Sequence, residues 1–130
     1  MKFNMGCGHS RLEGWVNVDK FPSPAVDQLV DLETLPWPWP DNCAETVRFA
    51  HSLEHMGETA RGYLGIIGEL YRICRHEAEV EITVPHPRHD HFLHDPTHVR
   101  PVTCESLACL DQDSNRRKIA AGAANTPLGL

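Results

Sequence analysis

Apolar and polar residues alternate in five short segments of the chain, and this period of two predicts β-strands. The segments are residues 1–5, 15–19, 27–31, 46–50 and 79–84. In the last segment Val80, Ile82 and Val84 alternate with acidic residues and a threonine. Strands of a parallel sheet that is covered on both faces are usually continuous apolar runs. The alternation therefore predicts a sheet with one face bare or covered by another chain.

One segment, residues 58–74, repeats its apolar residues every three or four positions and predicts the one long helix. The connections between the first three strands, residues 6–14 and 20–26, are too short for a helix. Parallel strands are still possible, because about seven extended residues span roughly 23 Å and a short strand needs a return path of about 13 Å. The pattern predicts an α/β fold whose first crossovers are coil.

A chain of 130 residues is long enough for one domain with a modest core. We divide it into a core that carries the strands, residues 1–84, a histidine-rich loop, residues 85–103, and a tail, residues 104–130, that its own sequence specifies weakly. Residues 103–110 predict a short helix at the start of this tail.

Charge and cysteine content exclude several classes of partner. The formal net charge is -6 and the only basic cluster is Arg116, Arg117 and Lys118, which argues against a nucleic-acid partner. Five cysteines without a CxxC pair argue against a disulfide framework and against a zinc knuckle. No apolar run is long enough for a membrane span. We expect a soluble, cytoplasmic protein.

Two glycines follow the first predicted strand in the turn Gly6-Cys7-Gly8, and acidic residues, Asp19 and Asp31, end the next two strands. Ligands of open α/β sheets bind at the carboxyl ends of the strands, where a glycine turn brings backbone N–H groups close to a ligand. A lone GxG is often only a tight turn, and acidic residues also end strands as turn formers. The combination favours a nucleotide-type site.

Four motifs occur in order along the chain: GCG, GWVNVD, DLETLPWP and LEH. In this order the chain resembles the class I S-adenosylmethionine-dependent methyltransferases, in particular a small bacterial methyltransferase type 11-like family, from residue 1 to about residue 103. The resemblance implies a Rossmann-like, mostly parallel sheet in the order 3-2-1-4-5, with reduced helices on one face. It also implies S-adenosylmethionine as the cofactor and a small-molecule methyl acceptor.

The resemblance also implies which residues contact the cofactor. Gly6, Cys7 and Gly8 would approach its methionine part, Asp19 would bind both ribose hydroxyls, Asp31 and Leu32 would lie at the adenine, and His51 would close the site. Trp37 and Trp39 stand between prolines in an expected extended loop, residues 32–42. Their indoles are expected either to flank the adenine or to plug the edge of the core.

The chain departs from the family pattern at several positions. Asn4 stands where an acid is usual, Ser10 stands at the third glycine position, and residues 75–77 replace a basic-Pro-Gly turn before the fifth strand. Family members add two further strands, and the sixth would begin at residues 124–130. The chain therefore resembles a member that is truncated at its carboxyl end, which affects catalysis more than cofactor binding.

Five of the nine histidines lie in residues 85–100. They do not form the HExxH pattern, and prolines prevent one continuous helix through them, so we expect no metal site. The catalytic candidates are His86, His89 and His98 from this loop, together with His55 from the LEH motif. One of them could orient or deprotonate a nucleophile. Methyl transfer itself needs mainly alignment of the reacting atoms, so a base is not obligatory.

Two other functions stay open. The chain could be a non-catalytic cofactor-binding or assembly module with the same fold, or a metal-dependent hydrolase that uses the histidine-rich loop. We also expect a homodimer, because the fifth strand would lie at an uncovered edge of the sheet and such an edge tends to recruit another strand.

Overall fold

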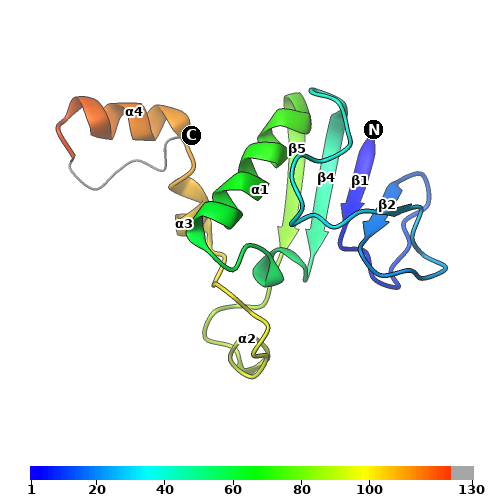
Figure 1. Ribbon diagram of the computed structural model, residues 1–130. Helices are drawn as coiled ribbons and strands as arrows, with labels where there is room; N and C mark the ends of the chain where they lie inside the picture. Colours follow the sequence, from blue (N-terminus) through cyan, green and yellow to red (C-terminus); the bar gives the residue numbers. More distant parts are fainter. Residues whose placement is uncertain (124–130) are drawn as a thin grey trace.

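The computed structural model describes residues 1–123, and its centre is a five-stranded sheet in the order β3-β2-β1-β4-β5 (Figure 1). All neighbouring strands are parallel. The strands are β1 (Lys2–Met5), β2 (Val16–Asp19), β3 (Gln28–Leu29), β4 (Ala44–Ala50) and β5 (Cys74–Thr83). The predicted α/β class and strand order are therefore confirmed.

Few helices accompany this sheet. They are the 3-10 helix η1 (Leu53–His55) and the α-helices α1 (Ala60–Ile73), α2 (Asp90–Leu93), α3 (Cys104–Ala108) and α4 (Gln112–Ala120). None of the helices in residues 1–123 has the length and the apolar character that a membrane crossing requires. The segment 124–130, where the sixth strand of the resembled family would begin, lies outside the described residues.

One face of the sheet is apolar and carries the core. Phe3 pairs in register with Val47, and Met5 pairs with Phe49, and all four side chains are fully buried. Helix α1 covers this face with Ile66, Leu70 and Ile73 (Figure 1). Because burial of one such side chain contributes roughly 1.5–3 kcal/mol, this layer is the main source of stability.

The proline-rich loop between β3 and β4 completes the apolar layer with its two indoles. Trp37 and Trp39 are buried, and the rings of Phe3 and Trp39 lie 4.8 Å apart. The indole N–H of Trp37 donates to the Leu32 carbonyl (2.9 Å) and that of Trp39 donates to Gln28 Oε1 (2.8 Å). The expectation that these indoles plug the core is confirmed.

The other face of the sheet is polar at its centre, where Asn4 and Asn17 are register partners and both are buried. Asn4 Nδ2 donates to Asn17 Oδ1 (2.9 Å) and to the Ser10 carbonyl (2.8 Å). Asn17 Nδ2 donates to the Leu12 carbonyl (3.0 Å) and to Asp27 Oδ2 (2.8 Å). We call Asn4, Asn17 and Asp27 the amide network. Its hydrogen bonds hold the first crossover on the sheet in place of a helix.

The prediction of a bare face is therefore wrong over β1 and β2, where the crossover loop of the chain itself lies against the sheet. Over β4 and β5 the same face carries the ion pair of Arg48 and Glu81, at 3.2 Å, with side chains 31% and 57% exposed. Asn4 and Asn17 point to this polar face, and their amides bind the carbonyls of the crossover loop. The loop can therefore cover the face without a helix. Whether β5 pairs with a second copy of the chain stays a prediction.

The passage from α1 to β5 differs from the expected turn. Cys74 caps the helix and is already the first residue of the strand. The register then jumps from the pair Ala44 and Cys74 to the pair Thr46 and Glu79, so that residues 75–78 bulge out of the sheet. Glu77 takes a φ of 60° in this bulge. The strand expected at residues 79–84 therefore begins five residues earlier.

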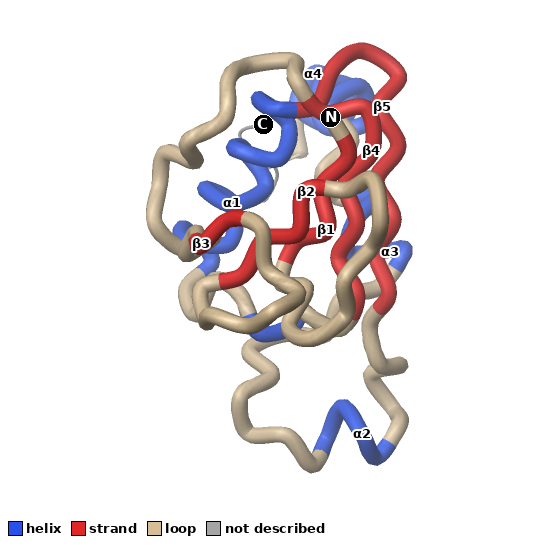
Figure 2. Tube along the Cα trace, turned by 90° about the vertical axis from the view of Figure 1, so that its right-hand side faces the viewer, coloured by secondary structure: helices blue, strands red, loops and turns tan. Residues whose placement is uncertain are grey.

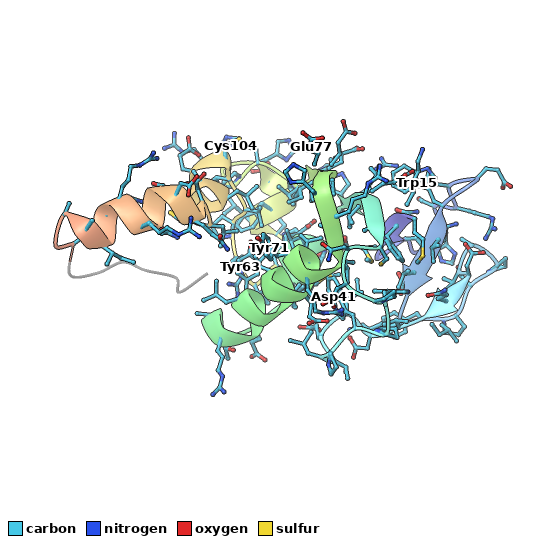
Figure 3. All side chains as sticks on the ribbon, turned by 90° about the horizontal axis from the view of Figure 1, so that it is seen from above. Trp15, Asp41, Tyr63, Tyr71, Glu77 and Cys104 are labelled. Carbon is cyan, nitrogen blue, oxygen red and sulfur yellow. The ribbon has the colours of Figure 1, made fainter. Side chains whose placement is uncertain are left out.

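Helix α4 was not expected, because its segment was interpreted as a weakly specified tail. Its N-cap is Asp111, whose side chain accepts from the backbone N–H of Ser114. Ile119 is 52% exposed, so the helix has almost no apolar stripe that a sequence pattern could reveal. Figures 1 and 3 show that α4 extends away from the sheet, beyond α1 and β5.

Candidate functional site

A pocket of about 230 Å³ lies at the carboxyl ends of β1, β2 and β4. It is lined by five of the seven residues predicted to contact a cofactor: Gly6, Asp19, Asp31, Leu32 and His51. Lys20, Ser52, His55 and Met56 complete much of the wall. We call this the strand-end pocket. It is where ligands of open α/β sheets bind.

The glycine turn that enters this pocket is held close to the start of η1. Gly6 has a φ of +67°, and a Cβ atom at this position would lie 2.6 Å from the Cβ of Ser52. Ser52 is itself fixed, because its hydroxyl donates to the Met5 carbonyl at 3.0 Å. Only glycine fits both this conformation and this contact.

Cys7 and Gly8, the other two residues of the turn, do not line the pocket. The Cys7 side chain is buried, and burial, followed by the charge of Asp19, raises the pKa of its thiol. Gly8 donates its backbone N–H to Asp19 Oδ2 at 2.8 Å. The Cys7 side chain therefore lies in the core. The backbone of Gly8 holds the Asp19 carboxylate in place.

Asp19 is positioned by backbone donors. Its Oδ2 accepts from Gly8 and its Oδ1 accepts from the backbone N–H of Phe21 at 2.9 Å. Each carboxylate oxygen can accept a second hydrogen bond. The side chain therefore shapes the turn and still offers two acceptors to a ligand with neighbouring hydroxyl groups.

Asp31 and Leu32 form the wall that follows β3. Asp31 Oδ1 accepts from the backbone N–H of Glu33 at 3.0 Å, and Leu32 is buried. The Asp31 carboxylate can accept a hydrogen bond from the edge of a flat ring. Leu32 offers an apolar surface to the face of that ring. Trp37 and Trp39 do not line this pocket, and their indoles pack in the apolar layer of the core instead.

His51 follows β4 in a strained conformation. Its φ is +54°, and its backbone N–H donates to the Thr83 carbonyl at 2.7 Å. A residue with a bulky side chain is rarely found in this region, and such strain concentrates at functional sites. Its imidazole is 63% exposed and reaches the rim of the strand-end pocket.

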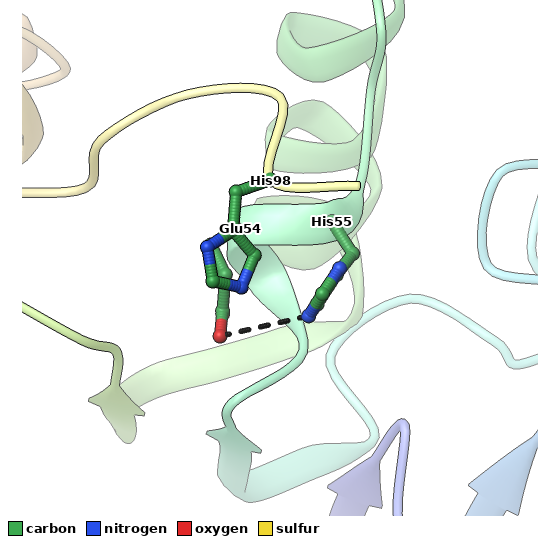
Figure 4. A group of neighbouring side chains, drawn as sticks. All are labelled: Glu54, His55 and His98. Carbon is green, nitrogen blue, oxygen red and sulfur yellow. Dashed lines mark ion pairs between the residues drawn. The ribbon is translucent and has the colours of Figure 1, made fainter. Parts of the chain in front are cut away.

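A second group of side chains adjoins the pocket through His55. Glu54 and His55 come from η1 and His98 comes from the histidine-rich loop, and one nitrogen or oxygen atom of each lies within 4.8 Å of the others (Figure 4). We call these three residues the Glu54 cluster. The rings of His55 and His98 lie 4.6 Å apart.

The structure brings two of the four catalytic candidates together and leaves two apart. His86 and His89 lie near α2, on a loop that extends beyond the carboxyl ends of the strands (Figure 2). Nδ1 of His86 accepts from the backbone N–H of Arg88, and Nδ1 of His89 accepts from that of His91, each at 3.1 Å. These bonds shape the loop.

Glu54 is the residue of this region that sequence reasoning missed. It stands between Leu53 and His55 in the LEH motif, and its side chain is only 1% exposed. The available signal was a carboxylate shortly after the end of β4, at Ala50, and next to a histidine. Its partner His98 lies far along the chain, so no local pattern reveals the contact.

A larger cleft, of about 1120 Å³, lies between α1, β5 and α4, at the opposite end of the sheet. Its lining includes Tyr71, His76 and Arg116. Among residues 1–123, the Glu54 cluster is the only group of three metal-ligand side chains, and this cleft does not contain it.

The strand-end pocket is smaller than the roughly 300–1,000 Å³ of typical ligand sites, so a nucleoside-sized ligand would extend past its rim. His51 and His55 are among the residues that line the pocket, and the His51 side chain is 63% exposed. The arrangement can hold a polar, ring-containing ligand and present its free end to these imidazoles. Comparison of the chain with protein-family models, with curated proteins and with solved structures found no match.

Proposed function

We propose that this chain has a Rossmann-like fold, binds S-adenosylmethionine in the strand-end pocket and transfers its methyl group to a small-molecule acceptor. One observation carries the proposal. Gly6, Asp19 and Asp31 come from three separate strand ends and line a single pocket in a parallel sheet of order 3-2-1-4-5. Ligands bind at such a place in open α/β sheets.

The lining residues suit the parts of this cofactor. Asp19 offers two carboxylate acceptors, which match the two neighbouring ribose hydroxyls. Leu32 offers an apolar surface to the adenine, and Asp31 offers an acceptor to its amino group. Gly6 lets the backbone approach the methionine part, since a side chain there would meet Ser52, which lines the same pocket.

The reaction itself requires little from the protein. The acceptor donates an electron pair to the methyl carbon, the carbon–sulfur bond breaks, and its electron pair returns to sulfur, so that S-adenosylhomocysteine is released. The main contribution of the protein is to align acceptor, carbon and sulfur. His51 and His55, which line the pocket, are the candidates for holding the acceptor in line.

Calorimetry with S-adenosylhomocysteine tests the proposal. We expect Gly6→Ala to abolish measurable binding, because the added methyl group would meet Ser52 and displace the wall of the pocket. Gly14→Ala is the matched control: its φ is also positive, at +77°, but an added Cβ would meet no atom of residues 1–123 within 4 Å and the residue does not line the pocket. Gly14→Ala should therefore keep most of the affinity.

Asp19→Asn should weaken binding roughly tenfold to a hundredfold, because hydrogen bonds to a charged group are worth about 1.5–3 kcal/mol. Asp113→Asn, on the exposed surface of α4, should leave the affinity unchanged. The absence of binding to the wild-type chain, or equal affinities of all four variants, contradicts the proposal. Production of S-adenosylhomocysteine with a panel of acceptors then distinguishes an enzyme from a non-catalytic cofactor-binding module.

A further inference from the structure

We propose that the Glu54 cluster binds one divalent transition-metal ion, such as Zn²⁺, through a Glu54 carboxylate oxygen and the Nε2 atoms of His55 and His98. This inference differs from the sequence expectation of no metal. It does not depend on the cofactor proposal, because the three ligands belong to a separate group that shares only His55 with the strand-end pocket.

The first argument is the state of Glu54. Its side chain is 1% exposed, and within residues 1–123 neither carboxylate oxygen accepts a hydrogen bond. The nearest potential cations are the imidazoles of His51 and His55, each with a nitrogen 3.9 Å from Oε1 (Figure 4 shows the second pair). A buried carboxylate without partners is costly, and buried charges are normally paired or bound to a metal.

The second argument is the orientation of the two imidazoles. Nδ1 of His55 lies 2.9 Å from the Thr97 hydroxyl, which donates its own proton to Asp95, so this nitrogen must carry the hydrogen. Nδ1 of His98 lies 2.8 Å from the Phe92 carbonyl, which can only accept. Both Nε2 atoms are therefore free to donate a lone pair. Metal-bound histidines are held by such bonds from their second nitrogen.

The third argument is distance. Ligand atoms in a tetrahedral zinc site lie about 3.3 Å apart, given bonds of about 2.0–2.2 Å. One ring nitrogen of each histidine and one Glu54 carboxylate oxygen lie within 4.8 Å of one another, and His55 Nε2 is 3.9 Å from Glu54 Oε1. A small inward movement of His98 closes the difference. The His98 side chain is only 7% exposed, and the next residue, Val99, donates its backbone N–H to the Glu54 carbonyl at 2.9 Å, so His98 is already held beside the cluster.

The donor set selects the kind of ion. Two imidazoles and one carboxylate suit zinc and the neighbouring transition metals, whereas Mg²⁺ prefers oxygen ligands alone. Three protein ligands leave a coordination position open, as in sites that bind water or a substrate. Asp95 Oδ2, 3.6 Å from Nε2 of His98, is a second carboxylate at the outer side of the cluster. The rival explanation is an ion pair of Glu54 with protonated histidines and no metal.

Calorimetric titration of the untagged, chelator-treated full chain with Zn²⁺ separates the two explanations. We expect one ion per chain for the wild type, at least a hundredfold weaker binding for Glu54→Gln and for His98→Ala, and no competition by Mg²⁺. His91→Ala is the matched control, because it removes a histidine from the same loop but outside the cluster. This control should bind Zn²⁺ like the wild type.

Thermal melting in chelator measures the stability of each variant in the absence of metal. In chelator, Glu54→Gln should melt at the same temperature as the wild type or higher, because it removes a buried charge. Zn²⁺ should raise the melting temperature of the wild type and not that of Glu54→Gln, since an ion that binds only the folded state stabilises it. Wild type that binds no Zn²⁺, equal losses in His91→Ala and His98→Ala, or equal stabilisation of wild type and Glu54→Gln would overturn the proposal.

Discussion

The two faces of strand β1 are stabilised in different ways. Phe3 and Met5 point into a layer of apolar side chains, whereas Asn4, between them, points into the amide network. Apolar packing has no fixed direction and tolerates a change of shape at modest cost. A buried polar network depends on every donor and acceptor. The difference teaches that hydrogen bonds from specific amides can hold a short crossover over β1 and β2, where a helix would otherwise pack.

The largest effect that this comparison predicts is at Asn17, which is fully buried. Asn17→Leu should lower the free energy of unfolding by at least about 3 kcal/mol, because it leaves several buried groups of the first crossover without partners. Met5→Leu, one strand away and also fully buried, should cost less than about 1.5 kcal/mol. Urea denaturation measures both values. A larger loss for Met5→Leu would remove the contrast between the faces.

Asn4→Asp is expected to have the next largest effect. The Asn4 amide donates to two acceptors, the Ser10 carbonyl and Asn17 Oδ1, and a carboxylate cannot donate to either. We expect a loss of about 2–3 kcal/mol at pH 7, measured by urea denaturation. A variant as stable as the wild type would show that the acid usual in the resembled family is equally acceptable here.

The amide network should also make stability depend on pH. The backbone and side chain of Asn17, and then Arg11, lower the pKa of Asp27 to about 2. This contribution is present above the unfolded pKa of about 3.9 and is lost as the pH falls toward 2. The stability difference between wild type and Asp27→Asn should therefore shrink from pH 5 to pH 2.5. A difference that stays constant over this range would contradict the assignment.

The smallest predicted effect sharpens the comparison on the apolar side. Gly68 lies in α1, and an added Cβ would meet no atom of residues 1–123 within 4 Å. Gly68→Ala should stabilise the protein by about 1 kcal/mol through helix propensity alone. Gly65→Ala should gain less, because its Cβ would lie 2.8 Å from a methyl group of Leu35. Thermal melting of the two variants compares them directly, and equal gains would mean that Leu35 simply moves aside.

Much of the fold could be predicted from the sequence, because the short crossovers follow from segment lengths and the resemblance carried by the ordered motifs implied the strand order. The bulge at Glu77 could not, since it depends on one residue with a positive φ. Helix α4 could not, because it has almost no apolar stripe. For the candidate site, the sequence indicated the residues at the strand ends. The Glu54 cluster requires a contact with His98 that only the folded chain creates.

The buried thiol of Cys7 has a consequence for oxidative damage. Thiolates, and not thiols, react with oxidants and alkylating reagents, and the raised pKa of Cys7 keeps it protonated at neutral pH. Cys104 and Cys109 are exposed and lie outside the sheet. Peroxide should therefore oxidise these two residues first. The glycine turn would stay chemically intact while the surface of the protein is already modified.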